Sequence, residues 1–228
     1  MNCRVCSRNE LTLIGRSVDD SANWYRCMAC GCDSSDVQIE LAYQAYQTQS
    51  YVDKHRVAGK EDPVSANVRW FEDYKPKVDG LDFLDVGHND GQALMSMQTA
   101  GWRVHGFDVN PHANYGTHTT IAPIFTASLF PRQYNAVMCK DVIEHVDTWR
   151  MLLIELYKVV KRGGVLQLQT PRPSVCSDPV GYHLHHLQLF NVSTLELELR
   201  RVGFEILDRW LWGDASRPFG QAWMCGKR

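Results

Sequence analysis

The sequence has no long apolar run and no excess of charge of either sign. Its 228 residues hold 24 Lys and Arg against 26 Asp and Glu, a formal net charge of -2. This balance disfavours a chain dedicated to nucleic acid or to an anionic membrane surface. Apolar runs such as residues 151–154 fall far below the roughly 18 residues that span a bilayer. No signal-like stretch follows Met1. We therefore expect a cytoplasmic protein that does not associate with membranes.

Cysteine is plentiful but unevenly spread, with five of the eight cysteines in the first 32 residues. Cytoplasmic cysteines stay reduced, so their grouping favours a metal site or catalysis over disulfides. Two Cys-x-x-Cys pairs are separated by 20 residues, a spacing that lets four thiolates surround one zinc ion. The predicted Zn²⁺ ligands are Cys3, Cys6, Cys27 and Cys30. A redox pair and a chance arrangement are the alternatives, and Cys32 either packs beside the site or replaces Cys30.

The predicted zinc ribbon spans residues 1–32 and carries four basic against three acidic side chains. Four thiolates around one Zn²⁺ make the segment slightly negative. Electrostatic binding of nucleic-acid phosphates requires more positive charge than this segment carries. A structural or substrate-covering role is therefore favoured over nucleic-acid binding.

Residues 33–62 form a polar connector with three tyrosines. Tyr43 and Tyr46 share one face of a predicted helix, which either packs onto the main domain or forms a lid over the site. Tyr51 follows in the same connector. The main domain is predicted over residues 63–228, and Val64–Tyr74 reads as its leading helix.

Strand-like and helix-like segments alternate through this main domain. The predicted strands are Leu81–Val86, Arg103–Val109, Ile121–Thr126, Ala136–Cys139, Val165–Gln169, Phe204–Leu211 and Gln221–Cys225. The predicted helices are Gln92–Ala100, Thr148–Lys161 and Ser193–Val202. Such alternation predicts an α/β fold with a doubly wound, mainly parallel seven-stranded sheet. Because no helical pattern separates the last two strands, they are expected to form a C-terminal antiparallel hairpin.

A glycine-containing turn follows the first of these strands. Gly87 and Gly91 let the backbone approach a ligand, and Asp108 ends the next strand, where a carboxylate can accept both hydroxyls of a ribose. A dinucleotide fold would show Gly-x-Gly-x-x-Gly. Here the acidic Asp85 precedes the glycines, which suits an ammonium group better than a pyrophosphate. The pattern favours S-adenosylmethionine over NAD.

These motifs resemble those of class I S-adenosylmethionine-dependent methyltransferases, whose first motif reads Asp-x-Gly-x-Gly-x-Gly. The resemblance covers about residues 64–228, and Asn89 stands in place of the middle glycine. Asparagine tolerates a left-handed backbone better than most residues. The resemblance implies that Asp85 and Gly87 line the methionine end of S-adenosyl-L-methionine, Asp108 holds the ribose and Val109 packs on adenine. The full set of implied cofactor-binding residues is Asp85, Gly87, Asn89, Gly91, Asp108, Val109, Ala127, Ser128 and Lys140.

Residues 134–146 resemble the fourth-strand motif of the same group, with its Glu-His-Val ending. His145 in this motif either acts as a base near neutral pH or only fixes the loop. The later segment 182–190 holds His183, His185 and His186. Its histidines could bind a second metal, deprotonate an acceptor or form structural hydrogen bonds. We predict that His186 is the general base, with His185 as the second candidate.

The sequence therefore predicts methyl transfer to a small-molecule acceptor, such as a sugar, a sugar nucleotide or a biosynthetic intermediate. An N-terminal zinc segment on such a domain resembles the sugar C-methyltransferases, although their additional C-terminal domain has no counterpart here. Nucleic-acid methylation is the enzymatic alternative, because ribosomal RNA guanine methyltransferases also carry a zinc ribbon. It is less favoured because the Asn-Pro-Pro-Tyr type of motif used for amino groups of bases is absent, and the fourth strand ends in Cys139-Lys140-Asp141-Val142. A non-catalytic protein that docks through its ribbon is the alternative from another class. No oligomeric state follows from the sequence.

Overall fold

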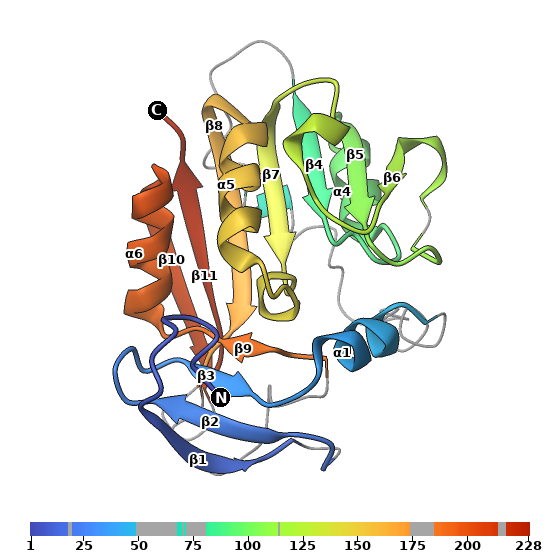
Figure 1. The fold of residues 1–228 in the computed structure, drawn as a ribbon. Helices are drawn as coiled ribbons and strands as arrows, with labels where there is room; N and C mark the ends of the chain where they lie inside the picture. Colours follow the sequence, from blue (N-terminus) through green and yellow to red (C-terminus); the bar gives the residue numbers. More distant parts are fainter. Residues whose placement is uncertain are drawn as a thin grey trace.

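The computed structural model describes residues 1–17, 20–48, 68–69, 71, 81–113, 115–173, 185–213 and 218–228. Two β-sheets organise these residues (Figure 1). One sheet has seven strands and the other has four. No helix within these ranges is long and apolar enough to cross a bilayer.

The larger sheet has the strand order β10-β11-β8-β7-β4-β5-β6. Its strands are β4 (Asp82–Val86), β5 (Arg103–Asp108), β6 (Thr119–Ile121), β7 (Tyr134–Lys140), β8 (Val160–Pro171), β10 (Glu205–Gly213) and β11 (Pro218–Gly226). All neighbours from β8 to β6 pair in parallel, whereas β11 pairs antiparallel with both β8 and β10. The predicted doubly wound, mainly parallel sheet with a C-terminal antiparallel hairpin is confirmed.

Helices cover both faces of this sheet, which explains why its central strands are apolar on both sides. They are α4 (Gln92–Thr99), α5 (Trp149–Val159) and α6 (Val192–Val202). Along β4, Phe83 belongs to the core cluster of Leu94 on α4, whereas Leu84 belongs to that of Leu153 on α5. Alternate side chains of one strand therefore build the two separate cores.

The smaller sheet is antiparallel and takes strands from both ends of the chain. Its order is β1 (Leu11–Arg16), β2 (Asn23–Cys27), β3 (Asp33–Ser35) and β9 (Gln188–Leu189). Helix α1 (Ile39–Tyr46) follows β3 and lies below the arrowheads of the central strands in Figure 1. Residues 33–35, which begin the predicted connector, thus continue the N-terminal sheet. The division at residues 32 and 62 stays a prediction.

Two local expectations have different outcomes. The third strand was expected at Ile121–Thr126, but β6 ends at Ile121. Pro123 has no backbone N–H to donate to a ladder, which accounts for the early end. Of the predicted leading helix Val64–Tyr74, only residues 68–69 and 71 are described, and these are helical. Tyr51, His183 and residues 62–63 lie outside the described residues.

Candidate functional site

The four cysteines of the two Cys-x-x-Cys pairs converge on one point. The Sγ atoms of Cys3 and Cys30 are 3.7 Å apart, and those of Cys6 and Cys27 are 3.5 Å apart. All four sulfurs lie within 4.8 Å of one another. Sulfurs placed tetrahedrally at the Zn–S bond length are about 3.8 Å apart. The backbone N–H of Val5 also donates to Cys3 Sγ, at 3.4 Å. The donor set therefore fits a Zn²⁺ ion.

Cys32 lies beside this group. Its side chain is fully buried, and its Sγ accepts a hydrogen bond from the backbone N–H of Asn191 at 3.2 Å. The cluster that could hold a metal contains Cys30 and not Cys32. Of the two positions considered for Cys32, the structure thus favours packing beside the site.

The turn between β4 and α4 has three residues with a left-handed backbone. Gly87, Asn89 and Gly91 have φ values of +82°, +49° and +78°. Asn89 thus adopts the conformation for which the middle glycine of the motif is suited. A Cβ atom on Gly87 would lie 2.3 Å from Cγ2 of Val142, so the turn also packs closely against the segment that follows β7.

Asp108 ends β5 beside this turn and is 1% exposed. Its two carboxylate oxygens accept backbone N–H groups, from Asn89 at 3.0 Å and from Asn110 at 2.8 Å. Burial raises the pKa of Asp108, and these hydrogen bonds act in the opposite direction. The amide of Asn110 also donates to the carbonyl of Tyr46 at 2.8 Å, which ties α1 to the same edge of the sheet.

Asp85 lies on β4 and is 3% exposed. Burial, and then the neighbouring carboxylate of Asp108, raise the pKa of Asp85 to about 8, while the ammonium of Lys140 acts in the lowering direction. Lys140 itself is exposed at the end of β7. An additional cation beside Asp85 would therefore stabilise its carboxylate form.

A cavity of about 780 Å³, its open mouth included, lies at the carboxyl ends of β4 and β5. The carboxyl edge of an α/β sheet is the place where such folds bind ligands. The cavity wall includes Gly87, Asp108 and Val109 on one side and Tyr43 and Tyr46 of α1 on another. The helical face on which Tyr43 and Tyr46 were predicted to lie together therefore faces the cavity.

Ala127 and Ser128, the predicted adenine contacts, are not in the wall of this cavity. Ala127 donates its N–H to Glu155 Oε2 at 2.7 Å, and Ser128 Oγ lies 3.0 Å from Thr126 Oγ1. The wall contains the preceding residues Pro123, Ile124 and Phe125, which the sequence analysis placed on a strand. A role of Ala127 and Ser128 in cofactor binding stays a prediction.

Three histidines from two segments meet beside the cavity. His145 ends a 3-10 helix (Ile143–His145), and His185 and His186 precede β9. Their ring centroids are 4.7–5.1 Å apart, and one nitrogen of each lies within 4.8 Å of the others, close enough for a metal ion. His145 and His185 line the cavity, whereas His186 is 7% exposed and is not in its wall.

Glu144 is a buried acid beside these histidines that sequence reasoning did not assign. Its side chain is fully buried, its Oε2 accepts from Thr170 Oγ1 at 2.8 Å, and its Oε1 lies 3.9 Å from Nε2 of His145. Burial raises the pKa of Glu144 well above its ordinary value, and Asp141 adds to the rise. The Glu-His-Val ending of the fourth-strand motif was the sequence feature that could have pointed to Glu144.

Comparisons with known proteins support one family. A family model described as a methyltransferase domain matches residues 43–209. A ubiquinone biosynthesis O-methyltransferase from Leptothrix cholodnii is 29% identical over 144 residues, which are 58% of this chain and 59% of that protein. The chain thus spans less than two thirds of that relative.

Solved structures show the same fold. The 1,6-didemethyltoxoflavin-N1-methyltransferase of Burkholderia thailandensis, with 1,6-didemethyltoxoflavin and S-adenosylhomocysteine bound, has a TM-score of 0.65 at 14% identity and covers 93% of this chain and 98% of its own. An S-adenosylmethionine-dependent methyltransferase from Archaeoglobus fulgidus has a TM-score of 0.63 at 17% identity, covering 79% of this chain and 100% of its own.

The close packing of Gly87 predicts a stability difference between two glycine substitutions. Gly101 has a similar φ of +87°, but a Cβ there meets nothing within 4 Å. Gly101→Ala should cost only the left-handed strain, about 1–2 kcal/mol. Gly87→Ala should cost an additional ~1–3 kcal/mol because it overpacks against Val142. Chemical denaturation measures both free energies of unfolding, and equal losses would contradict the expectation.

Proposed function

The chain belongs to the methyltransferase-domain family, and we propose that it transfers the methyl group of S-adenosylmethionine to a small-molecule acceptor. The observation that carries the proposal is one cavity whose wall contains both Gly87 and Asp108 of the predicted cofactor motif and the histidines His145 and His185. The family match, and relatives named for methylation of small molecules, support it.

The cofactor end would use residues at the carboxyl edges of β4 and β5. The carboxylate of Asp108 would accept the ribose hydroxyls, and that of Asp85 would face the ammonium of the methionine moiety. Val109 and Phe125 supply apolar wall for the adenine. The bound sulfonium supplies an activated methyl group; these side chains bind and orient it.

The acceptor end would use the histidines. S-adenosylmethionine would supply the methyl group, with its carbon–sulfur bond breaking as the acceptor oxygen or nitrogen bonds to the methyl carbon, and an imidazole of the chain would take the proton that the acceptor loses. His185 and His145 line the cavity and can reach an acceptor there. His186, the first choice from sequence, is not in the cavity wall but contacts the rings of His145 and His185 edge-on. It would therefore influence proton transfer through these two histidines.

A zinc ion in the cysteine cluster is part of the same proposal. The sulfurs of Cys3, Cys6, Cys27 and Cys30 would hold it, and no cysteine of that cluster is in the cavity wall within the described residues. Its role would be to stabilise the N-terminal segment, since such short segments have too little core of their own.

A small acceptor fits this site better than nucleic acid does. The cavity has tyrosines and apolar side chains in most of its wall, and the chain carries a formal net charge of -2. A duplex or a structured RNA would require a basic face. The acceptor would carry one ionisable hydroxyl or amine.

The raised pKa of Asp85 predicts that cofactor binding releases a proton. With a pKa of about 8 in the free protein, the neutral acid predominates at pH 6.5, whereas a bound ammonium favours the carboxylate. The affinity for S-adenosylhomocysteine should therefore rise up to about tenfold per pH unit between pH 6 and 8.

Calorimetric titration at pH 6.5 in buffers of different ionisation enthalpy measures this proton. Asp85→Asn should abolish its release, whereas Asp20→Asn, at a side chain that is 73% exposed, should not. Proton release unchanged in Asp85→Asn would contradict the assignment. Wild-type protein that binds no S-adenosylhomocysteine at millimolar concentration would instead support the non-catalytic alternative.

A second prediction concerns the base. The acceptor is first identified by transferring labelled methyl groups to an extract of small molecules and determining the mass of the product. With that acceptor, His185→Gln should lower kcat about 10²-fold or more. The affinity for S-adenosylhomocysteine should stay within about twofold of wild type, because His185 is on the acceptor side. His112→Gln, at an exposed turn, is the matched control.

The metal content of the same variants separates the two roles of the histidine cluster. A base role predicts the same metal content in His185→Gln as in wild type. Loss of one metal equivalent would assign the three histidines to a metal site instead, and an unchanged kcat would remove His185 from proton transfer.

The zinc proposal predicts about one zinc ion per chain after exhaustive dialysis. Cys6→Ser and Cys30→Ser should each lose most of this zinc, whereas Cys32→Ser should keep it because Cys32 lies beside the cluster. Elemental analysis by mass spectrometry measures the content. Equal zinc in Cys6→Ser and wild type would contradict the assigned ligand set.

A further inference from the structure

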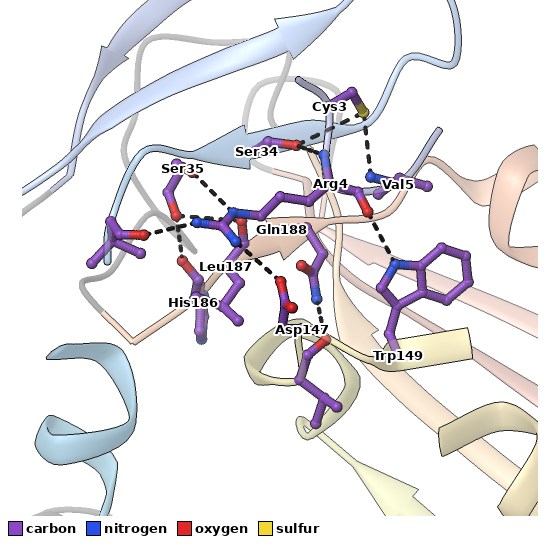
Figure 2. Close-up of polar contacts among 12 residues, drawn as sticks. Cys3, Arg4, Val5, Ser34, Ser35, Asp147, Trp149, His186, Leu187 and Gln188 are labelled. Atoms are coloured by element: carbon purple, nitrogen blue, oxygen red, sulfur yellow. Dashed lines mark hydrogen bonds and ion pairs between the residues drawn. The ribbon is translucent and has the colours of Figure 1, made fainter. Parts of the chain in front are cut away.

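Arg4 lies inside the first Cys-x-x-Cys pair and connects the cysteine cluster to the methyltransferase domain. Its guanidinium makes three hydrogen bonds: Nε to the carbonyl of Ser35 at 3.1 Å, Nη2 to that of Val37 at 2.8 Å, and Nη1 to Asp147 Oδ1 at 3.2 Å (Figure 2). Its own carbonyl accepts from Trp149 Nε1 at 3.2 Å. One residue of the metal-binding turn thus holds the end of β3 and the segment just after His145.

A second set of hydrogen bonds runs from β3 to the other histidine segment. Ser35 Oγ donates to the carbonyl of His186 at 3.0 Å, and the backbone N–H of Ser35 donates to the carbonyl of Leu187 at 3.1 Å (Figure 2). In the β3–β9 pair, Ser34 lies opposite Gln188. The backbone of residues 186–188 is therefore held by the N-terminal sheet.

The two histidine segments are also joined to each other. The N–H of Leu187 donates to the carbonyl of Glu144 at 2.8 Å, and Gln188 Nε2 donates to the carbonyls of Ile143 at 2.9 Å and Val146 at 3.0 Å. Nδ1 of His145 lies 2.9 Å from the carbonyl of His185. Displacement of either segment would thus move both histidines that line the cavity.

Burial makes these contacts hard to replace by water. Ser34, Ser35, Leu187 and Gln188 are fully buried, and the Arg4 side chain is 17% exposed. A guanidinium can serve three acceptors in a fixed fork, whereas an ammonium at the same place cannot span them.

We propose that the cysteine segment is a clamp for the acceptor-side histidines: metal bound at Cys3 and Cys6 fixes Arg4, and Arg4 with Ser35 fixes the backbone that carries His145 and His185. Arg4 and Ser35 are then positioning residues, and the proposal rests on the proposed function for the role of the histidines and for the metal at the cysteine cluster. The hydrogen bonds of the clamp do not include Asp85 or Asp108. Loss of the clamp therefore lowers kcat and spares cofactor affinity.

The experiment compares full-length Arg4→Ala, Arg4→Lys and Ser35→Ala with Arg8→Ala. Arg8 is the matched control because its side chain is 67% exposed and pairs with the exposed Glu10 at 3.4 Å. Hydrogen exchange reports on the amide of Leu187, and NMR reports on the ring signals of His145 and His185. Titration with S-adenosylhomocysteine reports on the cofactor side.

In Arg4→Ala and in metal-free wild type, the Leu187 amide should exchange about tenfold faster or more, and both histidine ring signals should shift. The affinity for S-adenosylhomocysteine should stay within about twofold. Arg4→Lys should restore part of the protection, and Ser35→Ala should reproduce the ring shifts if Arg4→Ala does not fold. Arg8→Ala should match wild type.

The clamp would be overturned if Arg4→Ala showed the amide exchange and ring signals of wild type. If Arg4→Ala does not fold, Ser35→Ala decides by the same criterion. Wild-type exchange and ring signals in the metal-free protein would also overturn the clamp. Failure of the wild-type protein to bind S-adenosylhomocysteine would overturn the proposed function instead, and the exchange comparison would still decide the clamp. Equal kcat in Arg4→Ala and Arg8→Ala, once an acceptor is known, would likewise contradict it.

Discussion

The parallel pairing of β4 with β5 and β7 is the constraint on which the site depends. Asp85 lies opposite Gly106 on one side and Met138 on the other, so the turn after β4, the end of β5 and the segment after β7 share one edge of the sheet. A shift of one residue would exchange the two faces of β4 and place Leu84 in the core of α4. The packing that separates Phe83 from Leu84 therefore also places Asp85 and Asp108.

That edge gathers acidic groups with few cations. Asp85, Asp108 and Glu144 are each at most 3% exposed, and burial raises the pKa of each. Lys140 is exposed, and of the cations near Asp85 it is the one that lowers this acid's pKa. A ligand with a positive charge would stabilise the ionised acids, whereas a pyrophosphate would oppose them. The assignment of Asp85 to an ammonium-bearing cofactor stays a prediction.

The sequence predicts what depends on local pattern. The spacing of Cys3 and Cys6 predicts a pair of metal ligands. The glycines at Gly87 and after it, together with the preceding strand, predict the ligand-binding turn. Contacts between distant segments leave no such signal: two residues of β9 join β3, and α1 places Tyr46 in the wall with His145. The adjacent His185 and His186 show the same limit, because the sequence does not indicate that His185 lines the cavity and His186 does not.

The N-terminal segment shares a core with the methyltransferase domain instead of having one of its own. Cys3, Val5 and Cys27 belong to the same buried cluster as Trp149 of α5 and Phe190 beside α6. Strand β1 is exposed along nearly its whole length, so little apolar burial holds it in place. The segment is therefore ordered by two features, its cysteine cluster and its contact with the domain. Those contacts fall on the two segments that carry His145 and His185, and this shared attachment is what the proposed clamp would act through.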